Sequence, residues 1–539
     1  YHYLLRHVSY CKPVIISLGT IPLCGCVHDP KDTKENPESH RPNILFCIAD
    51  DASYSHFSAY GCSWVKTPGF DRVAREGILF TNAYTPNAKS APSRACIITG
   101  RNSWQLEEAA NHITNFPARF KSFVEALKEE GYFTGYTSKG WAPGNPGTVD
   151  GKLRELTGKA FNSRTTSPPT GAISRSDYAA NFNDFLDQKP GDSPWFFWYG
   201  SHEPHRRYQY GSGVALGGKK TDQIEKVPDF WPDNDTVRND MLDYAFEIEY
   251  FDQQLVIMLN ELEKRGELKN TVVVVTSDNG MPFPRSKGLQ YEYSNHMPLA
   301  IMWHSGIEEP GRASKDYISF IDFAPTFLDL AGIDWNESGM ASSPGKSFRD
   351  ILKNSKKLSD RSFILLGQER HDYGRPLNQG YPIRSILKDG YLYQINFKPD
   401  LWPAGNPETG YLNTDGSPTK TFILNLRRNG IDVSYWTKCF GKHPDEELYN
   451  ITSDPECLIN LAGLSDYGEL KERMKTILMT ELKGQNDPRV LGNGDIFDKY
   501  GFDNPANWNF YERYMNGEIK KYQTGWVDPG DYETDTDIK

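Results

Sequence analysis

The sequence is poor in positive charge, and it lacks both internal repeats and low-complexity blocks. Its 539 residues include 60 Lys and Arg against 71 Asp and Glu, which gives a net charge of −11 at pH 7. This balance argues against sequence-independent nucleic-acid binding, which needs clustered cations to displace phosphate counterions. It still allows an anionic substrate, because a few local cations outweigh a distant net charge.

Cysteine is also scarce. Of eight cysteines, Cys11, Cys24 and Cys26 lie near the start of the chain. The other five are widely spaced: Cys47, Cys62, Cys96, Cys439 and Cys457. This odd number fits neither a disulfide framework nor a zinc pattern, so we expect mostly buried thiols. A bridge between Cys439 and Cys457 is left open.

The apolar run at residues 14–23 is too short to span a bilayer, which takes about 20 residues. It follows a basic flank and precedes Leu23-Cys24-Gly25-Cys26, an arrangement typical of a secretory signal and similar to the bacterial lipobox. We therefore expect a lipoprotein-type signal peptide at 1–26, a polar linker at 27–41, and export to the periplasm or cell surface. The lipid anchor would sit on Cys26; an ordinary signal peptide without lipid is the alternative.

Long apolar runs alternate with helical patterns over the first two thirds of the chain. Aromatic residues make up 13% of the composition, far too many for a disordered protein. The apolar runs lie at residues 43–49, 195–199, 272–275 and 299–303, and the helical patterns at 121–130, 172–187 and 240–265. This alternation predicts a mainly parallel sheet covered by helices on both sides, with ligands at the carboxyl ends of the strands.

The pattern changes near residue 360. Short strand-like pieces at 363–366 and 391–395 alternate with turns rich in Gly, Pro and Asn. These features predict a smaller antiparallel subdomain. We expect a catalytic domain at 42–360, a C-terminal subdomain at 361–490 and an extension at 491–539.

The most informative motif is SAPSRACIITGR at residues 90–101. Pro92 suits the first position of a helix, which would put Ser90 just before a helix N-terminus, where unpaired N–H groups attract anions. A capped helix with a structural arginine would explain a shorter match. The whole run resembles the signature of the formylglycine-dependent (type I) sulfatases, which is Cys or Ser, any residue, Pro, Ser, Arg and, a few residues later, Thr-Gly.

The resemblance implies that Ser90 is oxidised to Cα-formylglycine (3-oxoalanine). Serine at this position resembles the bacterial type that a radical-SAM enzyme matures. One hydroxyl of the aldehyde hydrate attacks sulfur and forms a covalent sulfate ester. Deprotonation of the other hydroxyl then expels sulfate and restores the aldehyde. The family fold is alkaline-phosphatase-like α/β, a mixed sheet sandwiched by helices with a smaller C-terminal α+β subdomain.

Acidic residues follow two of the expected strands. Asp50 and Asp51 end the first strand, and Asp278 and Asn279 follow the run at 272–275. Both elements match the metal-binding positions of the family. Three carboxylates and an amide oxygen form a hard donor set that suits one Ca²⁺ better than Mg²⁺ and does not suit zinc.

The resemblance also implies a ring of cations and histidines around the sulfate. Arg94 would hold the formylglycine hydrate, and Lys139 and Lys287 would bind sulfate. His205 would contact sulfate or protonate the leaving oxygen, and His202 would contact the substrate. A transition state with spread negative charge needs such fixed positive groups.

One position departs from the family pattern. Many sulfatases carry Lys-x-His where this chain has Lys139-Gly140-Trp141, so a second catalytic histidine is missing and His205 or another group must take over proton transfer. The Trp141 ring could stack on a sugar. His371 and Arg375, with residues 368–372, could line a sugar pocket or could be solvated turn charges.

The motifs at 277–284 and 380–384 look like the heparan N-sulfatase (sulfamidase) branch, whose bacterial relatives include ulvan-active enzymes; similarity covers about residues 41–490. The sequence therefore predicts a sulfatase acting on a polysaccharide or oligosaccharide of the algal ulvan or glycosaminoglycan type. A heparan-type N-sulfatase, a phosphate-ester hydrolase of the same superfamily, and a surface glycan-binding protein with unmatured Ser90 are the alternatives.

Overall fold

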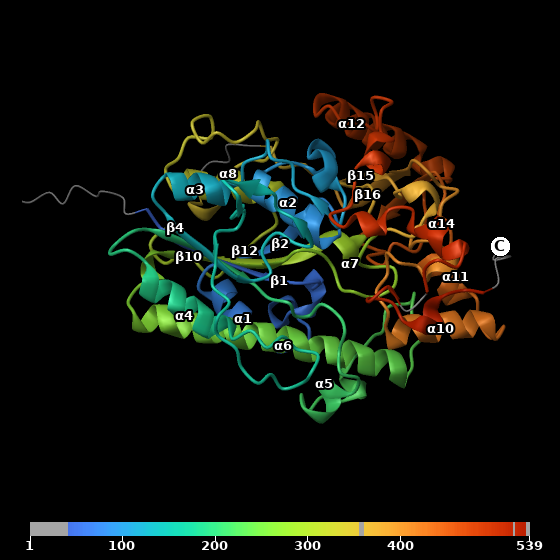
Figure 1. The fold of residues 1–539 in the computed structure, drawn as a ribbon, viewed down its shortest axis with the longest axis horizontal. Coiled ribbons are helices and arrows are strands. Elements are labelled where there is room, and N and C mark those ends of the chain that lie inside the picture. The colour runs from blue at the N-terminus through green and yellow to red at the C-terminus, as the bar shows by residue number, and fades with distance from the viewer. Residues whose placement is uncertain (1–40, 355–359, 521–522, 535–539) are drawn as a thin grey trace, which may run out of the picture. The chain divides into compact units, whose positions relative to one another are not determined.

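The computed structural model describes residues 41–354, 360–520 and 523–534, and the chain from Arg41 onward forms one compact unit. Its main sheet has nine strands in the order β12-β2-β11-β10-β1-β9-β4-β8, with β13 paired to β2 (Figure 1). The strands are β1 Asn43–Ala49, β2 Ile78–Tyr84, β4 Phe133–Ser138, β8 Lys159–Ala160, β9 Trp195–Gly200, β10 Thr271–Ser277, β11 His296–Met302, β12 Arg312–Ser314 and β13 Ile318–Ser319.

Three buried parallel strands form the centre of this sheet. β1 lies between β9 and β10 and runs parallel to both, with Ala49 opposite Ser277 and Ile48 opposite Gly200. Strands buried on both faces read as unbroken apolar runs, which is how the sequence predicted them. Because the three strands are parallel, their carboxyl ends meet at one edge of the sheet.

The other half of the sheet is less parallel than the alternation of helices and strands predicted. β11 pairs antiparallel with β10 and with β2. The apolar runs predicted β11 but did not identify β2 as a strand. An antiparallel strand buried on both faces has the same apolar composition as a parallel one, so composition does not reveal its direction. The result is the mixed sheet that the family resemblance implied.

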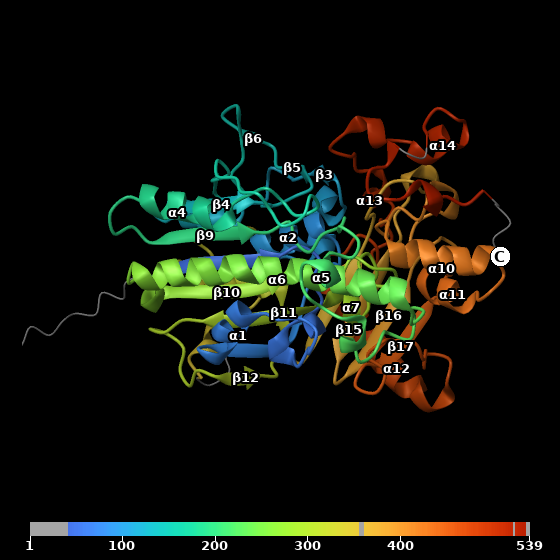
Figure 2. The ribbon, with the colours of Figure 1, turned by 90° about the horizontal axis from the view of Figure 1, so that it is seen from below.

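Helices cover both faces of the sheet (Figures 1 and 2). Alternate residues of β1 point to opposite sides: Leu45 and Cys47 join one core cluster, whereas Ile44 and Phe46 join the other. The first cluster includes side chains of α1 Pro68–Arg75, α4 Tyr178–Gln188 and α6 Asp235–Lys264; the second includes side chains of α2 Ser90–Thr99, α3 Phe123–Glu129 and α8 Phe323–Leu330. The main domain is therefore a three-layer α/β/α sandwich.

The predicted antiparallel sheet lies in the C-terminal part. Its strands, in the order β14-β15-β16-β17, are β14 Phe363–Gln368, β15 Ile383–Lys388, β16 Tyr391–Asn396 and β17 Glu446–Asn450. Helix α12 Gly468–Gly484 packs on this sheet through Met474 and Leu478. Trp104, from the main domain, belongs to the same apolar cluster, so the two sheets share packed side chains.

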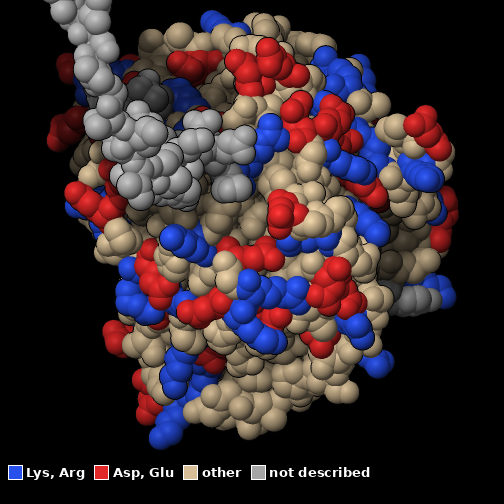
Figure 3. All heavy atoms as spheres, turned by 90° about the vertical axis from the view of Figure 1, so that its left-hand side faces the viewer, with Lys and Arg blue, Asp and Glu red and all other residues tan. Residues whose placement is uncertain are grey.

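The bridge left open between Cys439 and Cys457 does not form, because both thiols are free and buried. Among the described helices, none combines the length and apolarity that a bilayer crossing requires. The expected signal peptide, nearly all of the linker and Cys26 lie outside the described residues. On the face drawn in Figure 3, acidic and basic side chains are intermingled.

Candidate active site

The carboxyl ends of β1 and β10 bring four polar side chains together. Asp50 and Asp51 follow β1, and Asp278 and Asn279 follow β10, its parallel neighbour. Asp51 adopts the left-handed conformation (φ 75°), and its N–H donates to Asp278 Oδ1 at 3.1 Å. One oxygen from each of the three carboxylates lies within 4.8 Å of the others. All four side chains are buried.

Ser90 lies beside these carboxylates and is only 2% exposed. It is the first residue of α2, with Lys89 at the N-cap, so the helix begins two residues earlier than Pro92 indicated. Its hydroxyl donates to Asp50 Oδ1 at 3.2 Å and lies 3.5 Å from Asn279 Oδ1. The helix N-terminus thus presents Ser90 to the acidic cluster in an environment that favours anions.

Arg94 lies one helical turn after Ser90 and faces the same cluster. Its Nε donates to Asp278 Oδ2 at 2.8 Å, and its Nη1 donates to the carbonyls of Lys139 and Gly140 at 2.9 and 3.0 Å. The side chain is fully buried. Arg94 therefore joins α2 to the end of β10 and to the residues that follow β4.

Two lysines complete the cluster from separate loops. Lys139, just after β4, places Nζ 2.6 Å from both oxygens of Asp50 and 3.1 Å from Ser90 Oγ. Lys287 donates to Asp51 Oδ2 at 2.6 Å. The structure thus gathers at one site cations that lie almost 150 residues apart in the sequence.

Asp415 is a site residue that sequence reasoning missed. It is buried, and its Oδ2 accepts a hydrogen bond from Lys287 Nζ at 3.0 Å. It lies in a turn just before α10 Pro418–Arg428, where an Asp-Gly pair reads as ordinary turn chemistry. No signal in the sequence distinguished this turn from exposed ones.

Nearby cations offset the effect of burial on the carboxylate pKa values to different extents. Burial alone would raise the pKa of Asp50, but Lys139, His205 and Arg94 lower it well below its usual value. For Asp278, burial raises the pKa; Arg94 opposes this shift and the negative charge of Asp50 reinforces it. The cluster therefore contains one strongly stabilised carboxylate and one that is poorly compensated.

The residues present fit a hard divalent cation. Two oxygens on opposite sides of one Ca²⁺ lie about 5 Å apart, since each bond is about 2.4 Å. The three carboxylates come within this span, and the amide oxygen of Asn279 points to the same region, 3.5 Å from Ser90 Oγ. These oxygens are the donors that Ca²⁺ prefers, and no sulfur or imidazole belongs to the set.

The two predicted histidines follow β9. His205 Nδ1 lies 2.6 Å from the carbonyl oxygen of Arg206, which can only accept, so Nδ1 carries a hydrogen and Nε2 faces the site, 3.8 Å from Asp51 Oδ2. Its side chain is 33% exposed, unlike the buried cluster behind it. His202, three residues earlier in the same loop, is exposed, and it lies close enough to Asp50 and Lys139 for their charges to act on it.

Three of the side chains predicted to contact the sugar are buried. Trp141 is only 6% exposed; its ring packs against Phe116 and its Nε1–H donates to the Ala91 carbonyl at 3.0 Å. His371 is buried against Asn87, and Arg375 donates to backbone carbonyls near Trp402. These three side chains therefore support the loops around the site and do not present free faces to a sugar.

The segment at 368–372 contacts the start of α2, the helix that carries Ser90. Asp372 is buried, forms an ion pair with Lys89 at 2.7 Å, and lies within hydrogen-bond distance of His112 Nδ1 at 3.0 Å. Lys89 directly precedes Ser90 and occupies the N-cap position of α2. The second sheet is thus anchored to the start of the helix that carries the predicted nucleophile.

Replacing Trp141 by phenylalanine tests its assignment to the core. We expect Trp141→Phe to lower the free energy of unfolding by about 1–3 kcal/mol, because a buried hydrogen bond and part of a packed ring are lost. The KM for a glycan substrate should stay within about two-fold. Denaturant unfolding and steady-state kinetics measure both, with the half-exposed Trp508→Phe as the matched control; a large rise in KM with unchanged stability would contradict this assignment.

Comparisons with known proteins identify a family and several relatives. The family described as Sulfatase matches residues 42–333. An ulvan-active sulfatase of Formosa agariphila is 26% identical over 534 aligned residues, covering 90% of this chain and 83% of that protein. The N-sulphoglucosamine sulphohydrolase of Homo sapiens is 26% identical over 493 residues, covering 85% of this chain and 93% of that protein.

A solved structure shares the fold. It contains a protein in complex with its substrate D-glucosamine-2-N,6-O-disulfate, and it matches this chain with a TM-score of 0.57 at 20% identity. The match covers 83% of this chain and 98% of the other. Likeness at this level of identity concerns the architecture of the two sheets and their helices.

Proposed function

Because the chain belongs to the sulfatase family, whose match spans more than half of it, we propose that it hydrolyses sulfate groups on a sulfated polysaccharide or its oligosaccharides. One observation carries this proposal: the Ser90 hydroxyl lies within 3.2 Å of both Asp50 and Lys139. Relatives named for ulvan, N-sulphoglucosamine and N-acetylglucosamine 6-sulfate support a glycan substrate.

Ser90 is the proposed nucleophile precursor. Oxidised to formylglycine by a radical-SAM enzyme, it would supply a hydrated aldehyde with one hydroxyl for attack on sulfur and a second for release of sulfate. Lys139 Nζ already donates to the Ser90 oxygen, and Arg94 holds the helix against Asp278. These contacts would orient the modified side chain toward the substrate.

Asp50, Asp51, Asp278 and Asn279 would hold one Ca²⁺. The ion supplies positive charge that acidifies a nearby hydroxyl and screens an anionic substrate. Lys139 and Lys287 would bind sulfate oxygens, because both ammonium groups are buried beside the carboxylates at fixed positions. His205 would give a proton to the leaving oxygen through Nε2, since its Nδ1 is engaged with the Arg206 carbonyl.

Removing divalent cations tests the metal assignment. We expect EGTA treatment to lower sulfate release at least about ten-fold and Ca²⁺ to restore it. At 100 times its dissociation constant, Ca²⁺ should also stabilise the fold by about 2.7 kcal/mol. Thermal unfolding with and without Ca²⁺ measures this independently of activity, with Mg²⁺ as the comparison; equal stability and activity in EGTA would contradict the site.

Sulfate released from a panel of defined oligosaccharides is the experiment that tests the function. The panel contains ulvan, heparan, chondroitin and carrageenan fragments, and includes an N-sulfated glucosamine to test the sulfamidase alternative. Matured protein should release sulfate from at least one of them. An aryl phosphate cleaved faster than the matching aryl sulfate would favour a phosphate-ester hydrolase.

Mass spectrometry of the peptide that contains Ser90 separates the enzyme from a glycan-binding protein. Formylglycine lacks two hydrogens of serine, so the native protein should show this loss. An intact serine in protein from its native host would favour the binding protein.

Export and a lipid anchor at Cys26 belong to the same proposal. Incorporation of radiolabelled fatty acid into the protein tests the anchor.

A further inference from the structure

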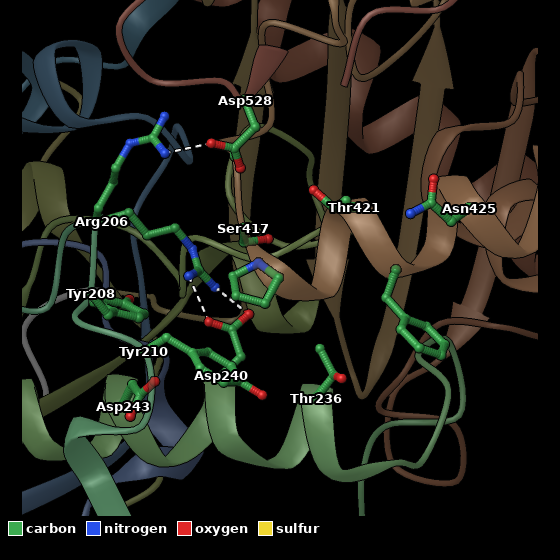
Figure 4. Close-up of a pocket in the computed structure, with 14 residues that line it drawn as sticks. Arg206, Tyr208, Tyr210, Thr236, Asp240, Asp243, Ser417, Thr421, Asn425 and Asp528 are labelled. Atoms are coloured by element: carbon green, nitrogen blue, oxygen red, sulfur yellow. Dashed lines mark hydrogen bonds and ion pairs between the residues drawn. The ribbon is translucent and has the colours of Figure 1, made fainter. Parts of the chain in front are cut away.

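A cavity of about 470 Å³ opens beside the loop that follows β9 (Figure 4). Its walls come from the loop after β9, from α6, from the start of α10 and from Asp528. Ligand pockets for small molecules begin at about 300 Å³, so this volume is large enough for a sugar unit. None of the roles proposed above uses this space.

Two chain segments connect the cavity lining to the proposed sulfate site. Arg206 lines the cavity and directly follows His205, and Gly416 lines it and directly follows Asp415. Arg206 Nε also donates to the carbonyl of Pro282 at 2.7 Å, three residues after Asn279. Adjacent Cα atoms lie about 3.8 Å apart, so the backbone at these two points connects the cavity lining directly to residues of the sulfate site.

The charges that line the cavity are paired within the protein. Arg206 forms two hydrogen bonds with Asp240, at 2.7 and 2.9 Å, and Arg207 pairs with Asp528. Figure 4 shows both ion pairs as dashed lines. A third carboxylate, Asp243, accepts hydrogen bonds from backbone N–H groups of the loop. Two arginines therefore face three carboxylates, and a ligand anion would compete with an existing partner at each arginine.

Apart from these paired or hydrogen-bonded charges, the side chains that line the cavity are neutral. Tyr210 is 55% exposed, and Thr236 and Asn425 enter from α6 and α10, on either side of the space. Pro418 and Phe422 add apolar surface. An aromatic ring with amide and hydroxyl groups around it suits a sugar ring, which has apolar faces and hydroxyl edges.

We propose that this cavity binds an uncharged sugar unit that neighbours the sulfated one, and that it disfavours a uronate or a second sulfated sugar there. The inference rests on the proposed sulfatase function and narrows its substrate class. The sulfate site supplies the cations for one anionic group, whereas the adjoining cavity recognises a neutral ring.

Kinetics with three matched probes test this. All share the sulfated sugar that the panel identifies: the monosaccharide, a disaccharide with galactose as the neighbour, and one with glucuronate. We expect the galactose disaccharide to have a KM about ten-fold below that of the monosaccharide, and the glucuronate disaccharide to show no gain. Tyr210→Ala should reduce the KM ratio of monosaccharide to galactose disaccharide about five- to ten-fold. Asn425→Lys should lower the KM for the glucuronate disaccharide relative to that for the galactose disaccharide. Trp508→Ala, which removes another exposed ring, is the control.

Equal KM values for the monosaccharide and the galactose disaccharide, or a lower KM for the glucuronate disaccharide, would overturn the inference. So would a Tyr210→Ala protein with the wild-type ratio. If no probe releases sulfate, the proposed function fails by itself. Calorimetric titration of the wild-type and Tyr210→Ala proteins with unsulfated lactose then tests whether the cavity binds a neutral sugar. Weaker binding by the variant supports the inference, and no binding by either protein refutes it.

Discussion

Sulfate release should fall roughly 10⁴-fold or more when Ser90 is replaced by alanine, because covalent catalysis has no substitute for its nucleophile. The Ser90 hydroxyl donates to Asp50 at 3.2 Å, lies 3.5 Å from Asn279 and accepts a hydrogen bond from Lys139 at 3.1 Å. Its loss should change stability little, because Lys139 and Asp50 remain paired with each other at 2.6 Å. Initial rates on the best substrate of the panel, together with thermal unfolding, measure the two effects separately.

A matched control lies on the same helix. Thr99 is buried, and its hydroxyl donates to the Ala95 carbonyl within α2, away from the acidic cluster. Thr99→Val should keep activity within about three-fold, since it removes only an intrahelical hydrogen bond. If Ser90→Ala retains the rate of the parent protein, the formylglycine mechanism is wrong and another nucleophile must be sought.

Arg384→Met is expected to lower the free energy of unfolding by about 3–5 kcal/mol. Arg384 is fully buried and pairs with Asp487 at 2.8 Å and with Glu369 at 2.7 Å. Methionine fills much of the same volume but leaves both carboxylates buried without this partner. Glu369 would keep a second one, Arg489, at 2.6 Å. Urea unfolding followed by fluorescence measures the change.

Arg473→Met provides the comparison for this variant. Its side chain is 65% exposed, and its ion pair with Glu469 spans 3.7 Å, so its replacement should change stability by less than about 0.5 kcal/mol. Similar small effects for both arginines would mean that the Arg384 pairs add little stability. The double variant Asp487→Asn with Arg384→Met should recover part of the loss, because it removes one uncompensated charge.

Arg384 also illustrates the limit of motif reading. It belongs to the motif at 380–384 that resembles the heparan N-sulfatase branch. In the structure it joins β15 to Glu369, just after β14, and to Asp487, after α12, away from Ser90. A motif identifies a relative, but the contacts of each side chain decide whether it touches substrate or holds the fold.

Sequence patterns were reliable where one local property was enough. Buried parallel strands need continuous apolar runs, and such runs located β1, β9 and β10. Acidic residues directly after two of these strands had to meet, because neighbouring parallel strands end at the same edge of the sheet. The positions of Asp50, Asp51, Asp278 and Asn279 relative to one another therefore followed from short stretches of sequence.

Only the tertiary structure decided which distant loops complete the site. Asp415 reaches Lys287 from a turn 128 residues away, and Asp372 pairs with Lys89 and His112 from the second sheet. Turn residues have the same composition whether the turn is buried or exposed, so their burial depends on how the two sheets pack. The direction of the Trp141 ring, into the core, depends on that packing too. Local chemistry is encoded in adjacent residues, whereas these partnerships arise from long-range contacts that no short pattern contains.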